Sequence, residues 1–136
     1  MNLILKNILA VIAGLVVGSL VNMGLVMLGP MIIPVPEGVD VSSSESLAQS
    51  MHLFGFQHFI FPFLAHALGT LVGALSTSWL ATSRKMLFAM IIGLFFLAGG
   101  ITNIFILPSP IAFTIIDLVF AYIPMAWLGA RIMLRK

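Results

Sequence analysis

Apolar residues run through the chain in four long, almost uncharged stretches. These stretches are Asn7 to Gly29, Phe59 to Thr82, Met86 to Leu107 and Ile111 to Ala130. Each holds about 20 or more residues, enough for an α-helix to cross the roughly 30 Å hydrocarbon layer of a bilayer. Backbone groups in lipid must form their hydrogen bonds within such a segment, which favours helices. The pattern predicts an all-α integral membrane protein, a four-helix antiparallel bundle built as one domain over residues 1–136.

The first stretch also permits a second interpretation, a cleaved signal peptide. A short segment with Lys6 precedes it, as in a signal peptide. Its apolar run, however, is longer than the roughly 7–15 residues of a signal sequence, and no A-x-A-like cleavage site follows. We therefore expect a retained transmembrane helix.

Residues 30–57 form the one long connection, and its prolines predict that it starts extended. Ser42 and Glu45 match a capping box, with Ser42 as the N-cap. Apolar residues follow at helical spacing: Leu47, Ala48, Met51 and Phe54. The segment predicts a short amphipathic helix on the outer membrane surface, and a plain loop is the alternative.

Composition supports the membrane interpretation. The 136 residues are 61% hydrophobic and 7% charged, with a mean hydropathy of +1.21. Soluble domains carry roughly 25% charged residues, so this chain is not expected to be a soluble enzyme, a nucleic-acid-binding protein or a disordered regulator. The absence of cysteine excludes disulfides and thiolate metal sites.

The few charges divide by sign along the predicted topology. All six basic residues fall on one side of a four-span bundle: Lys6, Arg84, Lys85, Arg131, Arg135 and Lys136. Glu37, Asp40 and Glu45 fall on the other side. Because basic residues collect on the cytoplasmic side, both termini are predicted to be cytoplasmic, in a plasma membrane or a bacterial inner membrane. Trp79 and Trp127 lie near the cytoplasmic ends of their spans, as interfacial aromatics do.

Small residues recur every four positions in the first two spans. One stripe is Ala10, Gly14 and Gly18, and the other is Ala65, Gly69 and Gly73. Such stripes let helix backbones approach closely in lipid. They predict close packing within the chain or, alternatively, contact with a protein partner or a second copy.

Two prolines lie inside predicted spans, Pro62 in the second and Pro124 in the fourth. Each lacks the backbone N–H that a helix interior uses. We expect a kink at each position.

Every predicted span carries a polar side chain in the same outer layer. Counting about 1.5 Å per residue places these side chains roughly 6–12 Å below the outer boundary. They are Asn22, His66, Asn103 and Asp117. His58 lies near the outer interface, and Thr114 shares the helix face of Asp117.

Asp117 is the one charge that the topology does not explain. An ionisable group within a span is costly and is expected to face the bundle interior or a water-filled cavity. In one interpretation Asp117 is a buried hydrogen-bond anchor for Asn22, Asn103 or His66. In the other, Asp117 and His66 line a site for a cation, a proton or the polar head of a lipophilic ligand.

Three functions fit this pattern. The first is a non-catalytic subunit or assembly factor of a membrane complex, with the lipid bilayer and a protein as its partners. The second is a small oligomeric transporter or channel, and the third is a protein that binds a lipid or a quinone. No catalytic or nucleotide-binding motif is present. His52 and His58 lack a metal-ligand spacing, so we expect no catalytic residue, metal or resident cofactor.

Overall fold

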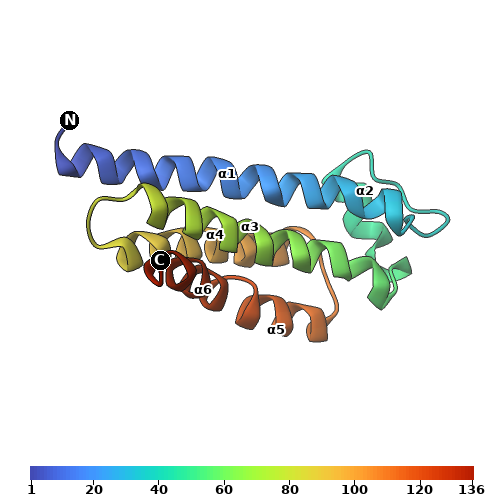
Figure 1. Cartoon of the computed structure of the whole chain (residues 1–136). Helices are drawn as coiled ribbons and strands as arrows, with labels where there is room; N and C mark the ends of the chain where they lie inside the picture. The colour runs from blue at the N-terminus through green and yellow to red at the C-terminus, as the bar shows by residue number, and fades with distance from the viewer.

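The computed structural model describes residues 1–136, and every regular element in it is a helix (Figure 1). In chain order the elements are α1 (Leu3–Ile32), α2 (Ser44–Ser50), η1 (Met51–Leu53), η2 (Phe56–Phe59), α3 (Ile60–Leu80), α4 (Lys85–Ile106), α5 (Ile111–Phe120) and α6 (Ile123–Leu134). Four helical segments are long and apolar enough to cross a membrane, and α5 with α6 makes the fourth. The predicted set of four apolar helices is confirmed.

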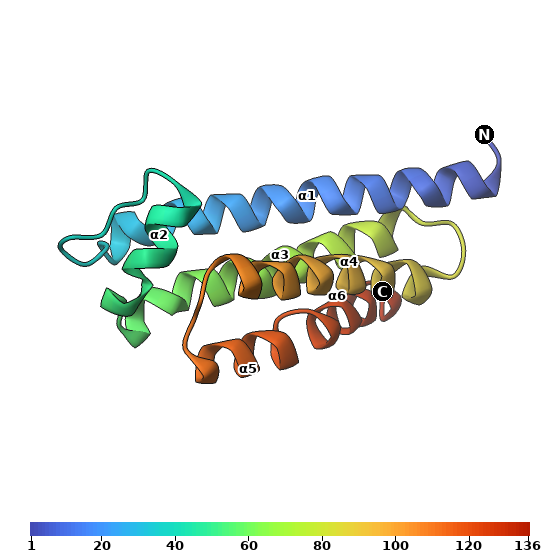
Figure 2. The ribbon, with the colours of Figure 1, turned by 180° about the vertical axis from the view of Figure 1, so that it is seen from behind.

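The bundle has two distinct ends. Both chain termini and the α3–α4 connection lie toward one end, which we call the basic end (Figures 1 and 2). Helix α2 and the α4–α5 connection lie toward the other, which we call the loop end. The basic residues belong to the termini or to the α3–α4 connection. The positive charges that the sequence places on one side of the membrane therefore also gather in space.

Glycines bring α1 and α3 into backbone contact. A Cβ atom added to Gly18 would lie 2.6 Å from the carbonyl oxygen of Gly69, and one added to Gly73 would lie 2.8 Å from that of Gly14. Both distances are shorter than van der Waals contact, so the helices can pack this closely only because these side chains are absent. The four glycines are thus used within the chain, as the intramolecular alternative predicts, and their faces are covered in the monomer.

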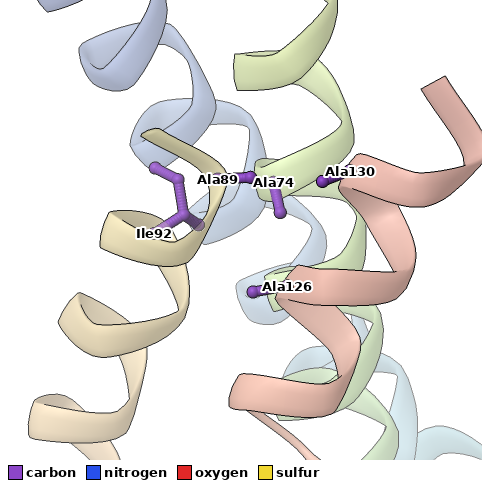
Figure 3. Close-up of a cluster of buried hydrophobic side chains, with 5 residues drawn as sticks. All are labelled: Ala74, Ala89, Ile92, Ala126 and Ala130. Atoms are coloured by element: carbon purple, nitrogen blue, oxygen red, sulfur yellow. The ribbon is translucent and has the colours of Figure 1, made fainter. Parts of the chain in front are cut away.

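Small side chains also fill the half of the bundle near the basic end. A cluster of five fully buried residues joins α3, α4 and α6 (Figure 3): Ala74, Ala89, Ile92, Ala126 and Ala130. Four of the five are alanines, so three helix backbones meet around little side-chain volume. The helices in this half of the bundle are therefore closely packed.

Asn7 links the start of α1 to the α3–α4 connection by hydrogen bonds. Its side-chain amide donates to the Ser83 hydroxyl at 2.9 Å, and its carbonyl oxygen accepts from the Thr82 backbone N–H at 2.9 Å. Asn7 is 6% exposed. The sequence marks Asn7 only as the start of a span, because both of its partners are more than seventy residues away.

The long connection differs in detail from its prediction. Helix α1 continues through Pro30 to Ile32, so the extended segment starts one turn later than expected. The predicted short helix forms, but its N-cap is Ser43 rather than Ser42, and the Ser43 hydroxyl accepts from the Ser46 backbone N–H. Asp40 explains the shift, because its carboxylate accepts from the Ser42 N–H at 2.9 Å and holds Ser42 in the loop.

The two span prolines behave differently. Pro62 lies in the first turn of α3, where no backbone N–H is required, and α3 runs on without interruption. Pro124 lies at the start of α6, and the predicted fourth span breaks there into α5 and α6. Because the Pro124 ring is incompatible with a helical carbonyl at Phe120, α5 ends at that residue.

Candidate functional site

A cavity of about 530 Å³ opens near the loop end, between α1, α3, α4 and α5. Leu47 and Met51 from the α2–η1 segment also contribute to its walls. All six polar residues singled out in the sequence line this one cavity: Asn22, His58, His66, Asn103, Thr114 and Asp117. The remaining walls are mostly apolar, so the cavity combines a few polar groups with a hydrophobic lining. That these six residues bind a ligand remains a prediction.

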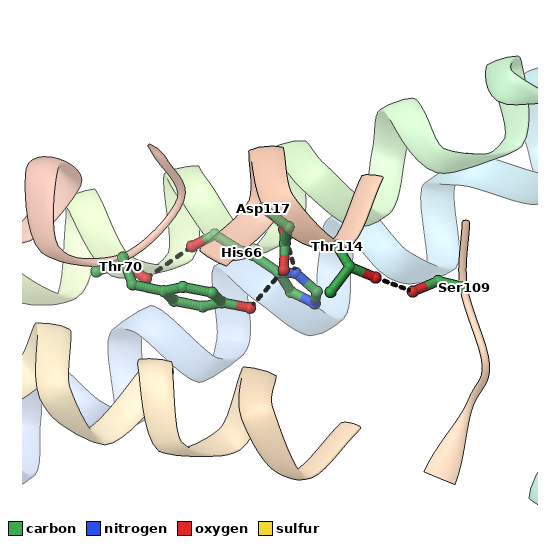
Figure 4. Close-up of polar contacts among 6 residues, drawn as sticks. His66, Thr70, Ser109, Thr114 and Asp117 are labelled. Carbon is green, nitrogen blue, oxygen red and sulfur yellow. Dashed lines mark hydrogen bonds and ion pairs between the residues drawn. The ribbon is translucent and has the colours of Figure 1, made fainter. Parts of the chain in front are cut away.

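Asp117 is the centre of a buried hydrogen-bonded triad. Its Oδ1 atom lies 2.8 Å from Nδ1 of His66, and its Oδ2 atom accepts from the Tyr122 hydroxyl at 2.9 Å. Asp117 is 5% exposed and Tyr122 is 2% exposed. Figure 4 shows the Asp117 carboxylate directed at the His66 ring from the neighbouring helix. Each oxygen of this buried polar group therefore has a protein partner.

Tyr122 was not predicted to belong to the site. In a continuous helix, residues five apart project about 140° from each other, so Tyr122 and Asp117 would face different directions. The break between α5 and α6 removes this constraint and turns the Tyr122 ring back toward the carboxylate. One feature of the sequence could have pointed to Tyr122: it is the single tyrosine of the chain, and it lies within a predicted span just before Pro124.

With Asp117 as a carboxylate, the triad assigns a hydrogen-bond role to each ring nitrogen of His66. A carboxylate can only accept, so His66 Nδ1 is the donor to Asp117. In the neutral imidazole, Nε2 then keeps its lone pair. No protein group bonds to Nε2, and 18% of the His66 side chain is exposed, on the wall of the cavity. In this neutral form, the cavity wall presents one oriented hydrogen-bond acceptor.

Two amide side chains add further unpaired polar atoms to the wall. Asn22 on α1 and Asn103 on α4 both line the cavity, and neither side chain forms a hydrogen bond within the protein. Asn22 is half-buried and Asn103 is exposed. An amide offers two donors and one acceptor oxygen, so together with His66 these residues can bond a group that both donates and accepts.

The rim of the cavity is held by local hydrogen bonds. His58 accepts from the Gly55 backbone N–H at Nδ1, 2.9 Å away, and its Nε2 lies 3.1 Å from the Pro34 carbonyl oxygen. The Ser109 and Thr114 hydroxyls lie 2.8 Å apart across the α4–α5 connection (Figure 4). His58 and Thr114 are therefore already paired, whereas His66, Asn22 and Asn103 retain free capacity.

The absence of a side chain at Gly100 leaves room for the Tyr122 ring of the triad. A Cβ atom there would overlap the Tyr122 hydroxyl and lie 2.6 Å from its Cζ atom. We expect Gly100→Ala to push the buried ring off Asp117 and to cost about 1–3 kcal/mol of stability. Gly99→Ala is the matched control, because a Cβ atom at Gly99 meets nothing within 4 Å. Thermal unfolding in detergent tests this, and equal melting temperatures for the two variants would contradict it.

No family model, curated protein or solved structure matches the chain. No group of three or more histidine, aspartate or glutamate side chains lies close enough together to hold a metal ion. What bears on function is therefore the chemistry of the cavity and its triad.

Proposed function

We propose that this protein binds one amphiphilic small molecule, of the lipid or quinol class, in the cavity near the loop end. The observation that carries the proposal is the free Nε2 atom of His66, oriented by Asp117 on the wall of a mostly apolar cavity. Ligand sites typically combine a hydrophobic lining with a few placed polar groups. The polar head of the ligand contacts His66, and its apolar part lies against the hydrophobic walls.

The polar groups favour a neutral head that carries a hydroxyl. Asp117 is 5% exposed and each of its oxygens already accepts a hydrogen bond, so little of the carboxylate is accessible to a cation. The neutral His66 ring accepts one hydrogen bond at Nε2, which a hydroxyl donates. The oxygen of the same hydroxyl accepts from the amide of Asn22 or Asn103. The proposal therefore specifies an alcohol, a phenol or a quinol rather than an ion.

The packing gives less support to a channel within one chain. The alanine-rich cluster of α3, α4 and α6 is fully buried and contains no polar side chain. Buried polar side chains on α3, such as Thr70 and Thr77, donate to backbone carbonyls. A non-catalytic subunit of a membrane complex remains compatible with our proposal, with the bound amphiphile as its functional ligand.

The charge distribution supports a specific orientation for this site. We propose that the basic end faces the cytoplasm, with both termini, in a plasma or bacterial inner membrane. The cavity then lies in the outer half of the bilayer. Its ligand exchanges with the outer leaflet.

A series of probes with one tail and different heads tests the proposed function. We would measure equilibrium binding of radiolabelled hexadecanol and of hexadecyl methyl ether to the protein in nanodiscs. The ether cannot donate to His66 Nε2, so we expect at least tenfold weaker binding, about 1.4 kcal/mol. Equal binding of the two probes would show that the head is not recognised, and the proposal would then be wrong.

Asn103→Leu separates ligand binding from folding. The Asn103 side chain has no hydrogen bond to lose within the protein and is exposed at the cavity wall. We expect unchanged thermal stability and about threefold to tenfold weaker hexadecanol binding, since one hydrogen bond contributes about 0.5–1.5 kcal/mol. Thr102→Val is the neighbouring control, because Thr102 bonds only its own helix at Ala98. Equal affinities for the two variants would remove Asn103 from the site.

A further inference from the structure

A second hollow lies beside the cavity, on the outer face of α3 and α5. This groove measures about 170 Å³ and is lined by seven residues, all hydrophobic, from η2, α3 and α5. They include Phe56, Ile60, Leu64 and Ile116. Phe56 is 76% exposed and Ile116 is 43% exposed. The groove therefore opens away from the bundle, onto the surface that a membrane would cover with hydrocarbon.

Two phenylalanines separate the groove from the cavity. Phe59 at the end of η2 and Phe113 on α5 belong to the linings of both hollows. Their ring centroids lie 4.9 Å apart, with 40° between the ring planes. The partition thus stands between the polar triad and the lipid-facing surface.

We infer that the groove binds the hydrocarbon tail of the same ligand whose polar head contacts His66. The inference rests on the proposed function and adds the class of ligand, a long-chain amphiphile that extends past Phe59 and Phe113. The occupant is a hydrocarbon chain because every lining residue is hydrophobic and because the groove adjoins the cavity, with Phe59 and Phe113 lining both.

Rotation of these two rings would join the hollows and give the ligand its route. A molecule dissolved in the bilayer reaches the groove laterally and passes its head between the rings into the cavity. The tail then remains in the groove, where it excludes the bulk lipid. A short-chain alcohol would occupy only the cavity and would not contact the groove at all.

Ile116→Trp tests this division of the ligand into two parts. Tryptophan at this position fills the groove, whereas Ile115→Trp, at a position that is 57% exposed and outside the groove, is the matched control. For Ile116→Trp we expect at least tenfold weaker binding of hexadecanol and unchanged binding of octanol. Ile115→Trp should change neither affinity. Unchanged hexadecanol binding by Ile116→Trp, or an equal loss for both alcohols, would overturn the inference.

Photolabelling gives a second measurement that uses the wild-type protein. Two hexadecanol probes carry a diazirine, one near the hydroxyl and one near the end of the chain, and labelled residues are mapped by mass spectrometry. We expect the first probe to label the cavity, and the second to label Ile60, Leu64 or Ile116 in the groove. Labelling of the cavity without the groove would overturn this inference alone. Absence of cavity labelling by the first probe would overturn the proposed function.

The methyl ether of the second probe distinguishes a tail site from ordinary boundary lipid. Without the hydroxyl, groove labelling should fall at least tenfold, because the head no longer holds the tail in place. Equal labelling by alcohol and ether would mean that the groove takes any lipid chain. That result would overturn the inference.

Discussion

Asp117→Leu is expected to destabilise the protein by about 2–5 kcal/mol, because each buried donor left without its acceptor costs about 1–3 kcal/mol. The substitution leaves His66 Nδ1 and the buried Tyr122 hydroxyl without their acceptor. It also frees the His66 ring to change its orientation, so hexadecanol binding should be lost. The free energy of unfolding in bicelles, measured by steric trapping, is the direct test. A loss below about 1 kcal/mol, the usual contribution of one neutral hydrogen bond, would contradict the importance of the triad.

Two further variants identify the cause of that loss. Asp117→Asn keeps the side-chain volume and one acceptor oxygen, so we expect a smaller loss than for leucine. Tyr122→Phe removes the hydroxyl that donates to Asp117. In the Asp117→Leu background, Tyr122→Phe should cost little or should stabilise, because it removes the buried hydroxyl that would otherwise lack an acceptor. A double-mutant cycle measures this coupling, and simple additivity of the two changes would contradict a direct bond between them.

Gly18→Ala is expected to cost about 1–3 kcal/mol, the typical penalty for overpacking. The new methyl group would lie 2.6 Å from the Gly69 carbonyl oxygen and 3.0 Å from the Phe96 ring. A backbone atom cannot move aside as a flexible side chain can, so α1 has to separate from α3. We expect an approximately equal loss for Gly69→Ala, whose Cβ atom would lie 2.9 Å from the Gly18 carbonyl oxygen.

Gly24→Ala provides the control on the same helix. A Cβ atom at Gly24 has nothing within 4 Å, so we expect a change below about 0.5 kcal/mol, as for most surface substitutions. Steric trapping compares the three variants in identical bicelles. If Gly18→Ala and Gly24→Ala lost equal stability, the cost would come from glycine itself rather than from the α1–α3 contact.

The candidate site could be foreseen in part because of the cost of polar groups in lipid. Asn22, His66, Asn103 and Asp117 stand out in apolar spans, and the rise of a helix is enough to place them in one layer. The structure brings all four to one cavity and selects His66 as the partner of Asp117. The depth of a residue along a helix does not specify in which direction its side chain points around the helix axis. The sequence therefore left Asn22, Asn103 and His66 as possible partners of the Asp117 carboxylate.

Tyr122 shows why the remainder of the site was missed. Its contact with Asp117 depends on a helix break, and the sequence analysis predicted only a kink at Pro124 within a continuous fourth span. Gly100 is a similar case, since its role comes from the nearby Tyr122 ring on another helix. The apolar groove was also missed, because in a membrane protein a lipid-facing hydrophobic residue has no sequence signal that separates a groove from a flat surface.

The sequence by itself determined the four apolar helices and the grouping of charge at their ends. The physical reason is local: a span in lipid has to satisfy its own backbone hydrogen bonds, so length and hydrophobicity suffice. Only the tertiary structure decided which glycines meet, which side chain pairs with Asp117, and where α5 ends. Those outcomes depend on backbone distances and side-chain directions between helices. In lipid, buried and lipid-facing positions are both hydrophobic, so the sequence pattern does not distinguish the faces of a helix.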